Sequence, residues 1–462
     1  MPQPNILFLI SDQHAPQVMG CMGADFVRTP NMDRLADDGV LFENAYCVYP
    51  HCVPSRASLM TGLECHRIPC YDNGAPYSSA LPTWAHMLRS SGYQTIMDGK
   101  MHFVGPDQHH GFHEHWHEPA CAVAGFRWGE ENPDASAYRY WSELHFEGDP
   151  KFENRMAIER ARVDSAVEFL EGADPEQPFC LTVGFYGPHY PMICTQEMFE
   201  SYDDVDIPEP LPDEHLHPRN RNWRDDVWGL HNFTEEQTRN SRQAYLAMVT
   251  TIDDWMGEVL QALERSGLAD DTIIIYAADH GEMWGEHGLW GKQTFYEESA
   301  RVPLIISAPE RGIGAGKRIE TPVSLLDIYP TLREMCDVRD WDVALDGRSL
   351  WRTLANGGEL EQEPVFSEYY GPDTLGPERM VRCGDLKLNY YHNQPLEMFD
   401  LAEDPRETRS VAQDPDYAED RERLLDLVTA NWDPEELDRL ARIDQNRRTL
   451  VGSCYPDAPK AL

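Results

Sequence analysis

The amino-acid sequence predicts an α/β fold in which a large, mixed but mostly parallel sheet is sandwiched by helices. Short apolar runs alternate with helical patterns over roughly the first 340 residues. These runs are continuous rather than alternating with polar residues. A strand that is apolar on both sides belongs to a sheet that is covered on both faces. The alternation and the continuous runs therefore indicate a helix–sheet–helix sandwich.

Each expected element has its own local signal. Strands are expected at residues 5–11, 94–97, 179–185, 272–277 and 302–307. Helices are expected at residues 31–38, 83–91, 156–170, 234–265 and 325–335. Pro30 and Gly39 bracket the first helix, and Thr234 with Gln237 gives a capping-box pattern at the start of the longest one.

Polar residues follow four of the expected strands. They are Asp12-Gln13, Lys100-Met101-His102, His189 and Asp279-His280. Sheets of this kind bind ligands beyond the carboxyl ends of their strands. We therefore expect these four groups to meet in one active site.

The pattern changes near residue 340. Closely spaced strands at 364–370, 380–383 and 386–391 suggest an antiparallel meander, and charged helices are expected at 418–430 and 434–443. We expect a catalytic α/β domain at residues 1–340, a smaller α+β domain at 341–445 and a C-terminal tail at 446–462.

Composition excludes some partners. The chain has 80 acidic and 39 basic residues, a formal net charge of −41. Such a surface repels nucleic acid and anionic membranes, so we expect neither as a partner. The apolar run Ile6–Ile10 is too short to span a bilayer and lacks the flanks of a secretion signal. Without such a signal we expect a cytoplasmic protein. Its eleven irregularly spaced cysteines are then expected to be mostly small buried side chains, and the absence of a CxxC pair gives no sign of a zinc site.

One motif gives the function. Residues 52–62 read CVPSRASLMTG, which contains C-x-P-x-R followed by a helix-forming run. Further segments follow a consistent order along the chain: NILFLISDQ, TPNMDRLADDGVLFENAYC, GKMH, GPHYP, ADHGEMWGEHGLWGK and LDGRSL. Together they resemble the type I, formylglycine-dependent sulfatases of the alkaline phosphatase superfamily over about residues 4–350. The resemblance implies an alkaline-phosphatase-like fold.

The resemblance also implies a reaction. In this family the cysteine matching Cys52 is oxidised by a formylglycine-generating or sulfatase-maturing enzyme. One hydroxyl of the aldehyde hydrate attacks sulfur, and the other then helps to expel the sulfate, so that one hard step becomes two easier ones. The chain is thus expected to be a sulfuric ester hydrolase that releases alcohol and sulfate from a small-molecule or sugar sulfate ester.

A divalent cation is implied as cofactor. Asp12, Asp279 and His280 match the family's metal positions together with modified Cys52. Gln13 stands where many sulfatases have a second aspartate, and we include it among the candidate ligands. Calcium is the family's usual ion. The imidazole tips the donor set slightly towards Mn²⁺ or Mg²⁺.

Basic residues match the sulfate-binding positions. Arg56 lies one helical turn after Cys52, so both can face one point, and the family's arginine here contacts the nucleophile. Lys100 and His102 lie two apart on an extended segment and point the same way. They match positions that bind the sulfate and the nucleophile.

Three further residues complete the candidate site. Lys292 matches a lysine between the sulfate and the leaving group, and His189 matches the histidine that protonates the leaving oxygen. Asn73 resembles an asparagine near the anion in the phosphonate hydrolase branch.

The substrate is less well defined. The segments around Asn73, residues 99–112 and residues 295–303 look like choline sulfatase, and Trp128 falls where those enzymes have an aromatic residue that could contact a quaternary ammonium. Choline sulfate and other small or sugar sulfates therefore both remain candidates. The local histidines His109, His110, His113, His115 and His117 suggest a polar loop at the pocket rim rather than a metal site.

Alternatives remain open. A phosphonate monoester or phosphodiester hydrolase of the same superfamily could use the same nucleophile and metal, although GKMH favours a sulfatase. An unmodified Cys52 would leave a non-catalytic binding protein, and a plain metal phosphatase would need Ser or Thr at this position. As in relatives with similar tails, we expect the C-terminal tail to contribute to a homo-oligomer.

Overall fold

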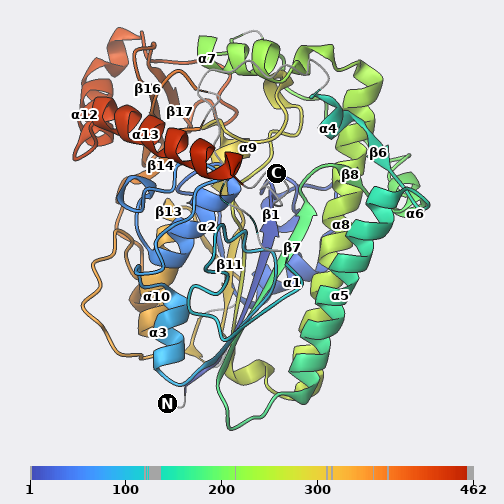
Figure 1. Cartoon of the computed structure of the whole chain (residues 1–462). Helices are drawn as coiled ribbons and strands as arrows, with labels where there is room; N and C mark the ends of the chain where they lie inside the picture. Colours follow the sequence, from blue (N-terminus) through green and yellow to red (C-terminus); the bar gives the residue numbers. More distant parts are fainter. Residues whose placement is uncertain are drawn as a thin grey trace.

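The structure is a computed structural model. It describes residues 3–118, 121, 123, 137–213, 215–308, 311–313, 316–356, 358–371 and 374–454 (Figure 1). None of the helices within these ranges is long and apolar enough to cross a lipid bilayer.

A central sheet organises the described chain. Its strands lie in the order β12-β2-β11-β9-β1-β7-β4-β5. The bounds are β1 Asn5–Asp12, β2 Val40–Phe42, β4 Gln94–Gly99, β5 Glu114–Trp116, β7 Phe179–Pro188, β9 Thr272–Ala278, β11 Leu304–Ser307 and β12 Lys317–Ile319. The neighbours β9, β1, β7, β4 and β5 run parallel, whereas β11 is antiparallel to both β9 and β2. The predicted mixed, mostly parallel sheet is confirmed.

Helices cover both faces of this sheet (Figure 1). Along β1 the side chains of Ile6, Phe8 and Ile10 enter one hydrophobic core, while Leu7 and Leu9 enter the other. The first core includes α2 (Cys52–Thr61), α3 (Trp84–Ser90) and α10 (Ile328–Met335). The second includes α1 (Pro30–Asp38), α5 (Pro150–Gly172) and α8 (Glu235–Ser266). This double coverage explains why the strand is apolar at consecutive positions.

Short elements link these layers. They are β3 Ala45–Tyr46, α4 Arg139–Ser142, β6 Leu144–His145, β8 Met192–Ile193, α6 Gln196–Glu200, α7 Pro218–Asn222, α9 Glu297–Ala300, β10 Arg301–Val302, β13 Val323–Ser324 and α11 Trp351–Asn356. The expected strand at 302–307 is divided at Pro303, because β10 pairs with β3 in a separate sheet. Helix α5 begins at Pro150 rather than at residue 156, since Asp149 caps it and proline suits the first helical position.

The C-terminal part contains the expected antiparallel meander. Strands β14 Val365–Tyr369, β15 Glu378–Cys383, β16 Leu386–Tyr391 and β17 Glu397–Asp400 pair in sequence, and α12 Ala418–Thr429 packs on β15 and β16. This sheet shares a hydrophobic cluster with the first part of the chain, in which Tyr49 and Tyr71 contact Tyr370. The domain boundary near residue 340 stays a prediction.

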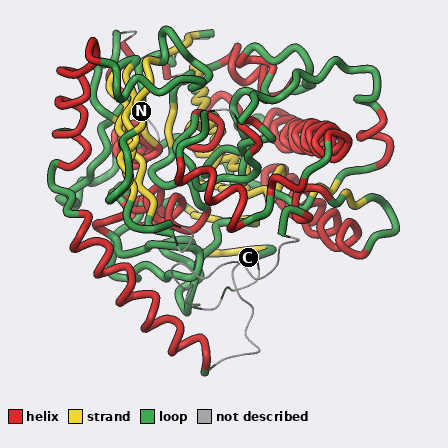
Figure 2. The backbone as a smooth tube through the Cα atoms, turned by 90° about the horizontal axis from the view of Figure 1, so that it is seen from above, coloured by secondary structure: helices red, strands yellow, loops and turns green. Residues whose placement is uncertain are grey.

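The last helix is longer than the sequence predicted. Helix α13 runs from Pro434 to Ser453 along the outer edge of the molecule (Figure 2), so the segment from 446 to 453 is helix rather than tail. Two of its polar side chains are buried on Asp72. Arg448 donates to both carboxylate oxygens of Asp72, at 2.8 and 2.6 Å, and Gln445 donates at 3.1 Å. The prediction ended too early because the buried residues in the second half of this helix, Gln445 and Arg448, are polar.

This buried ion pair predicts a large loss of stability when one partner is removed. Arg448→Met leaves the Asp72 carboxylate buried without its arginine, so we expect the free energy of unfolding to fall by about 3–5 kcal/mol. The measurement is the urea midpoint, at unchanged slope. The control is Arg447→Met, which removes an exposed arginine from the same helix. Equal midpoints for the two variants would contradict the prediction.

Candidate active site

The four predicted strand ends meet at one edge of the sheet. Asp12 is the last residue of β1, and Asp279, Lys100 and His189 directly follow β9, β4 and β7. These strands are neighbours, and all four side chains are buried. The Nζ atom of Lys100 lies 2.6 Å from Oδ2 of Asp12, and Nε2 of His189 lies 3.9 Å from its Oδ1. The structure thus brings together the residues that the strand pattern placed at one edge.

Two glycines set the position of Lys100. Gly99 and Gly184 face each other in the register of β4 and β7. Gly99 has φ +92°, and a Cβ atom on it would lie 2.3 Å from the Gly184 carbonyl oxygen. A Cβ atom on Gly184 would lie 2.3 Å from the Lys100 carbonyl oxygen. Only glycine at both positions permits this approach of the strands.

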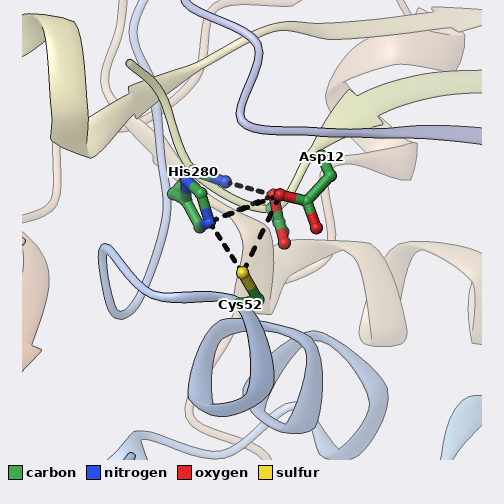
Figure 3. A group of neighbouring side chains, drawn as sticks. Asp12, Cys52 and His280 are labelled. Carbon is green, nitrogen blue, oxygen red and sulfur yellow. Dashed lines mark hydrogen bonds and ion pairs between the residues drawn. The ribbon is translucent and has the colours of Figure 1, made fainter. Parts of the chain in front are cut away.

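Cys52 is the first residue of α2, at the positive end of the helix dipole. Its Sγ atom lies 3.3 Å from Nε2 of His280 (Figure 3). It lies 3.3 Å from Nζ of Lys292 as well. The amide oxygen of Asn73 accepts a hydrogen bond of 3.0 Å from the Val53 backbone N–H. Asn73 therefore caps the helix that presents Cys52.

Each of the two carboxylates divides its oxygens between two tasks. Oδ2 of Asp279 accepts from Nε of Arg56 at 2.8 Å, and Oδ2 of Asp12 accepts from Nη2 of Arg56 at 3.2 Å. The other oxygens point towards His280: its Nε2 lies 3.8 Å from Oδ1 of Asp12 and 3.6 Å from Oδ1 of Asp279. Basic side chains thus hold the Oδ2 atom of each carboxylate. The two Oδ1 atoms both lie near Nε2 of His280, and the point between these three atoms is the candidate metal position.

The donors around this point fit a divalent cation. Ligand atoms of Asp12, Cys52, Asp279 and His280 all lie within 4.8 Å of one another, and all four residues are buried. Nδ1 of His280 lies 3.0 Å from the Gly281 carbonyl oxygen. Because a carbonyl only accepts, Nδ1 carries the proton and Nε2 presents its lone pair to the site. Carboxylate oxygens with one imidazole suit Mg²⁺, Mn²⁺ or Ca²⁺.

The two carboxylates differ electrostatically. Burial alone would raise the pKa of Asp12, but Lys100, His189 and Arg56 hold this pKa below its ordinary value. The pKa of Asp279 is raised, chiefly by burial and further by the nearby Asp12 charge, despite the contact with Arg56. A cation at the candidate metal position would relieve this repulsion.

Gln13 is turned to neighbouring side chains. Its Oε1 accepts from Nζ of Lys292 at 2.6 Å, and its Nε2 donates to Glu282. Its backbone N–H donates to Oδ1 of Asp279 at 3.1 Å. In this arrangement Gln13 positions Lys292 and Asp279, and its role as a metal ligand stays a prediction.

Glu282 is a site residue that the sequence reasoning missed. It is buried, and besides the Gln13 amide its carboxylate accepts the backbone N–H groups of Trp284 and Gly291 at 3.0 and 2.5 Å. These bonds fix the loop that carries Lys292. An acidic residue inside the apolar, glycine-rich segment that follows Asp279-His280 was the available signal.

His102 is held beside Cys52 by an unusual turn. It has φ +62°, and its backbone N–H donates to Oε1 of Glu118 at 2.8 Å, while the Met101 N–H donates to Oε2 at 2.8 Å. Its ring hydrogen-bonds Cys52. Trp128, by contrast, lies outside the described residues.

The histidine cluster is built into the loop structure. His110 stacks on Tyr77 with ring centroids 3.9 Å apart. His115 pairs with Glu118 at 3.1 Å, and His117 pairs with Asp98 at 2.7 Å. These contacts account for three of the histidines without a metal ion.

The positive groups change the protonation of the nucleophile position and of His189. Burial would raise the pKa of the Cys52 thiol, but Lys292, Lys100 and His280 bring this pKa well below its usual value. Burial, followed by Lys292, lowers the pKa of His189 to about 3. His189 is therefore neutral at pH 7, and its Nδ1–H donates to the Tyr190 carbonyl oxygen at 2.6 Å. Its Nε2 is left facing Asp12 and Cys52.

Known proteins are similar in sequence along nearly the whole chain. The sulfatase family model matches residues 4–338, and that of the N-sulphoglucosamine sulphohydrolase C-terminal region matches residues 285–432. Choline-sulfatase of Rhizobium meliloti is 36% identical over 98% of this chain and 93% of its own length. N-acetylglucosamine-6-O-sulfatase of Bacteroides thetaiotaomicron is 28% identical, over 92% of this chain and 86% of its own.

A solved structure extends the similarity to a second chemistry. The phosphonate monoester hydrolase of Agrobacterium radiobacter superposes with a TM-score of 0.75 at 25% identity, over 93% of this chain and 96% of its own. The family match covers more than half of the present chain, and it agrees with the Cys52 motif and the convergent site. The chain belongs to the sulfatase family and is a sulfuric ester hydrolase.

Proposed function

We propose that this chain hydrolyses a small-molecule or sugar sulfate ester at Cys52, after a formylglycine-generating or sulfatase-maturing enzyme has converted that residue to formylglycine. The observation that carries the proposal is the position of Cys52 Sγ at the start of α2, 3.3 Å from both Lys292 Nζ and His280 Nε2. When present, the aldehyde hydrate supplies the nucleophilic hydroxyl and the divalent cation supplies positive charge for the sulfuryl oxygens.

The chain's own cations bind the anionic ester. Lys292 lies beside the nucleophile position, and Nζ of Lys100 lies 2.6 Å from Oδ2 of Asp12. Arg56 orients the two carboxylates through its three hydrogen bonds to Asp12, Asp279 and the Lys100 carbonyl. Fixed charges in a buried site stabilise charge that develops in the transition state more strongly than the same charges in water.

His189 is the proposed proton donor to the leaving oxygen. Its ring orientation is fixed by the hydrogen bond from Nδ1–H to the Tyr190 carbonyl, so Nε2 is the atom that exchanges a proton within the site. At pH 7 the lowered pKa leaves Nε2 without a proton in the resting site, so His189 would donate only after Nε2 has accepted the proton that the nucleophilic hydroxyl loses. His102, which hydrogen-bonds Cys52, helps to orient the nucleophile.

Several finer assignments accompany this proposal. Asp12, Asp279 and His280 hold the cation, with Ca²⁺ as the usual family ion and Mg²⁺ or Mn²⁺ as alternatives. Asn73 caps the Val53 N–H and thereby helps to position α2, the helix that begins with Cys52. Choline sulfate is one candidate substrate, since the choline-sulfatase relative is 36% identical. A cytoplasmic location and a homo-oligomer remain predictions.

Removal of one proposed ligand should abolish cation binding. Asp279→Asn replaces one of the two facing carboxylates, so Mn²⁺, Mg²⁺ or Ca²⁺ should no longer raise the melting temperature of chelator-treated protein. The parent should gain about 2.7 kcal/mol when the ion is present at about 100 times its Kd. The control Asp253→Asn alters a carboxylate that contacts Asn31 and Met32 instead, and it should keep the shift. An undiminished shift in Asp279→Asn would refute the ligand assignment.

The competing activity is phosphonate monoester or phosphodiester hydrolysis. It is favoured by the fold of the Agrobacterium enzyme and by the neutral Gln13, which leaves one carboxylate fewer than many sulfatases have. Rates on an aryl sulfate and an aryl phosphonate monoester, measured with one preparation, separate the two activities. We expect the sulfate to be the better substrate. A phosphonate preference of several orders of magnitude would make the alternative the main activity.

Cys52→Ala should reduce turnover of the aryl sulfate by at least about 10³-fold, because the nucleophile is lost. The variant should keep the parent's unfolding curve. Peptide mass on the parent checks whether Cys52 carries the aldehyde. An unmodified thiol in fully active protein would disprove the formylglycine mechanism and would leave the thiol itself as the nucleophile to explain.

His189→Ala should discriminate between leaving groups. Alkyl sulfates need a proton on the departing oxygen, so their kcat should fall by about 10²–10⁴-fold, whereas nitrophenyl sulfate should lose far less. His109→Ala, which alters an exposed histidine, serves as the control. The same loss for both substrates would argue that His189 has a role other than that of the general acid.

A further inference from the structure

A pocket of about 580 Å³ borders His189. The lining residues come mainly from α4, the start of α5 and the end of β7, and they include Arg139, Lys151, Arg155, Tyr186 and Tyr190. Since His189 is the proposed donor to the leaving oxygen, a pocket at this residue is placed to take the alcohol part of the ester. The chemistry of the lining then indicates what kind of alcohol it accepts.

The charged residues of this lining are predominantly basic. Among the lining residues that the structure describes, Arg139, Lys151 and Arg155 face a single carboxylate, Glu143. None of the three cations forms an ion pair with a carboxylate of the described chain. Nζ of Lys151 instead lies 3.3 Å from Nε2 of His145. In a chain of net charge −41, three basic side chains around one pocket that form no close ion pair with a described carboxylate are unexpected on composition alone.

Arg155 occupies the inner part of this basic group. Its guanidinium lies 3.7 Å from the ring centroid of Tyr186, and its Nη1 donates to the His189 carbonyl oxygen at 3.4 Å. Burial lowers the pKa of Arg155, while Tyr186 and Glu159 act in the opposite direction. An anion in the pocket would compensate the Arg155 charge.

The aromatic residues nearest His189 are already engaged. The ring of Tyr186 has the Lys100 ammonium 3.9 Å from its centroid in addition to the Arg155 guanidinium. The ring of Tyr190 packs on His189 and Trp141, with centroids 4.2 and 4.5 Å apart. A quaternary ammonium needs free aromatic faces or carboxylates. These two rings instead contact the chain's own cations and rings.

We propose that this pocket binds the alcohol part of the substrate and that this part carries its own anionic group, such as a carboxylate or a second sulfate. The inference deepens the proposed sulfatase function and rests on it. It favours acidic or multiply sulfated alcohols over choline. Lys151 and Arg139, which are both exposed at the pocket, select this anionic group. The positive charge of Arg155, which lies next to Tyr186, also balances the charge of the anionic group.

Three phenyl sulfates test this selection. They carry –CH₂COO⁻, –CH₂CONH₂ or –CH₂N(CH₃)₃⁺ at the para position, so that the charge changes while the methylene spacer limits the change in leaving-group acidity. We expect kcat/KM to be highest for the carboxylate and lowest for the ammonium, with about a tenfold difference per step, and with KM carrying most of the difference. The preference should weaken as the salt concentration rises.

Variants link the preference to the pocket. Lys151→Gln and Arg139→Gln should each reduce the ratio of carboxylate to amide kcat/KM by several-fold, and the double variant should bring it near one. Arg160→Gln is the matched control. Arg160 lies on α5 like Lys151, but it pairs with Asp164 and Glu258. Arg160→Gln should leave the ratio of carboxylate to amide kcat/KM unchanged.

The outcomes separate the two levels of inference. Hydrolysis of the neutral amide substrate with no charge preference, or with a preference for the ammonium, would overturn the anionic pocket and leave the sulfatase function standing. Failure to hydrolyse any of the three by protein that cleaves an aryl phosphonate would overturn the proposed function and this inference with it. A preference that survives in the double variant would place the selecting charges elsewhere and refute the assignment to this pocket.

Discussion

The structure of the site depends on one arginine between two carboxylates. Arg56 donates to Asp12 and Asp279, which end two adjacent strands, and to the carbonyl of Lys100 on a third. All three contacts are buried. Two carboxylates at this separation would repel each other strongly without a cation between them. Because Arg56 holds only one oxygen of each, it balances part of their charge and still leaves both residues able to bind an ion.

The same constraint explains the sparing use of basic residues. The chain carries an excess of 41 acidic residues, but its substrate is an anion. Positive charge is therefore concentrated at Arg56, Lys100 and Lys292, where water is excluded and each charge acts strongly. Each of these three residues contacts a negative or polar partner in the site: Arg56 and Lys100 contact Asp12, and Lys292 contacts Gln13.

The parts of the site that the strand pattern predicted, without the family resemblance, are those that follow regular backbone structure. Asp12, Lys100, His189 and Asp279 come directly after continuous apolar runs, and parallel strands bring their carboxyl ends to one edge. Glu282 was missed because its importance lies in three hydrogen bonds made by loop backbone and Gln13, which leave no periodic signal. The end of α13 was misplaced for a related reason. Its buried residues there are Gln445 and Arg448, so the apolar pattern that marks a packed helix is absent.

The last two turns of α13, which the sequence did not predict, are linked to the active site. Arg448 binds Asp72, the adjacent Asn73 caps α2 at Val53, and α2 begins with Cys52. A short chain of buried polar contacts thus connects the C-terminal helix to the position of the nucleophile. A buried polar network of this kind is costly when any member lacks its partner, which favours a single arrangement of all its members. Residues 446–453, expected to be part of a tail, therefore contribute through Arg448 to holding the catalytic helix in place. The C-terminal part of the chain is then physically continuous with the active site, even though its sheet is separate from the one that carries the four strand ends.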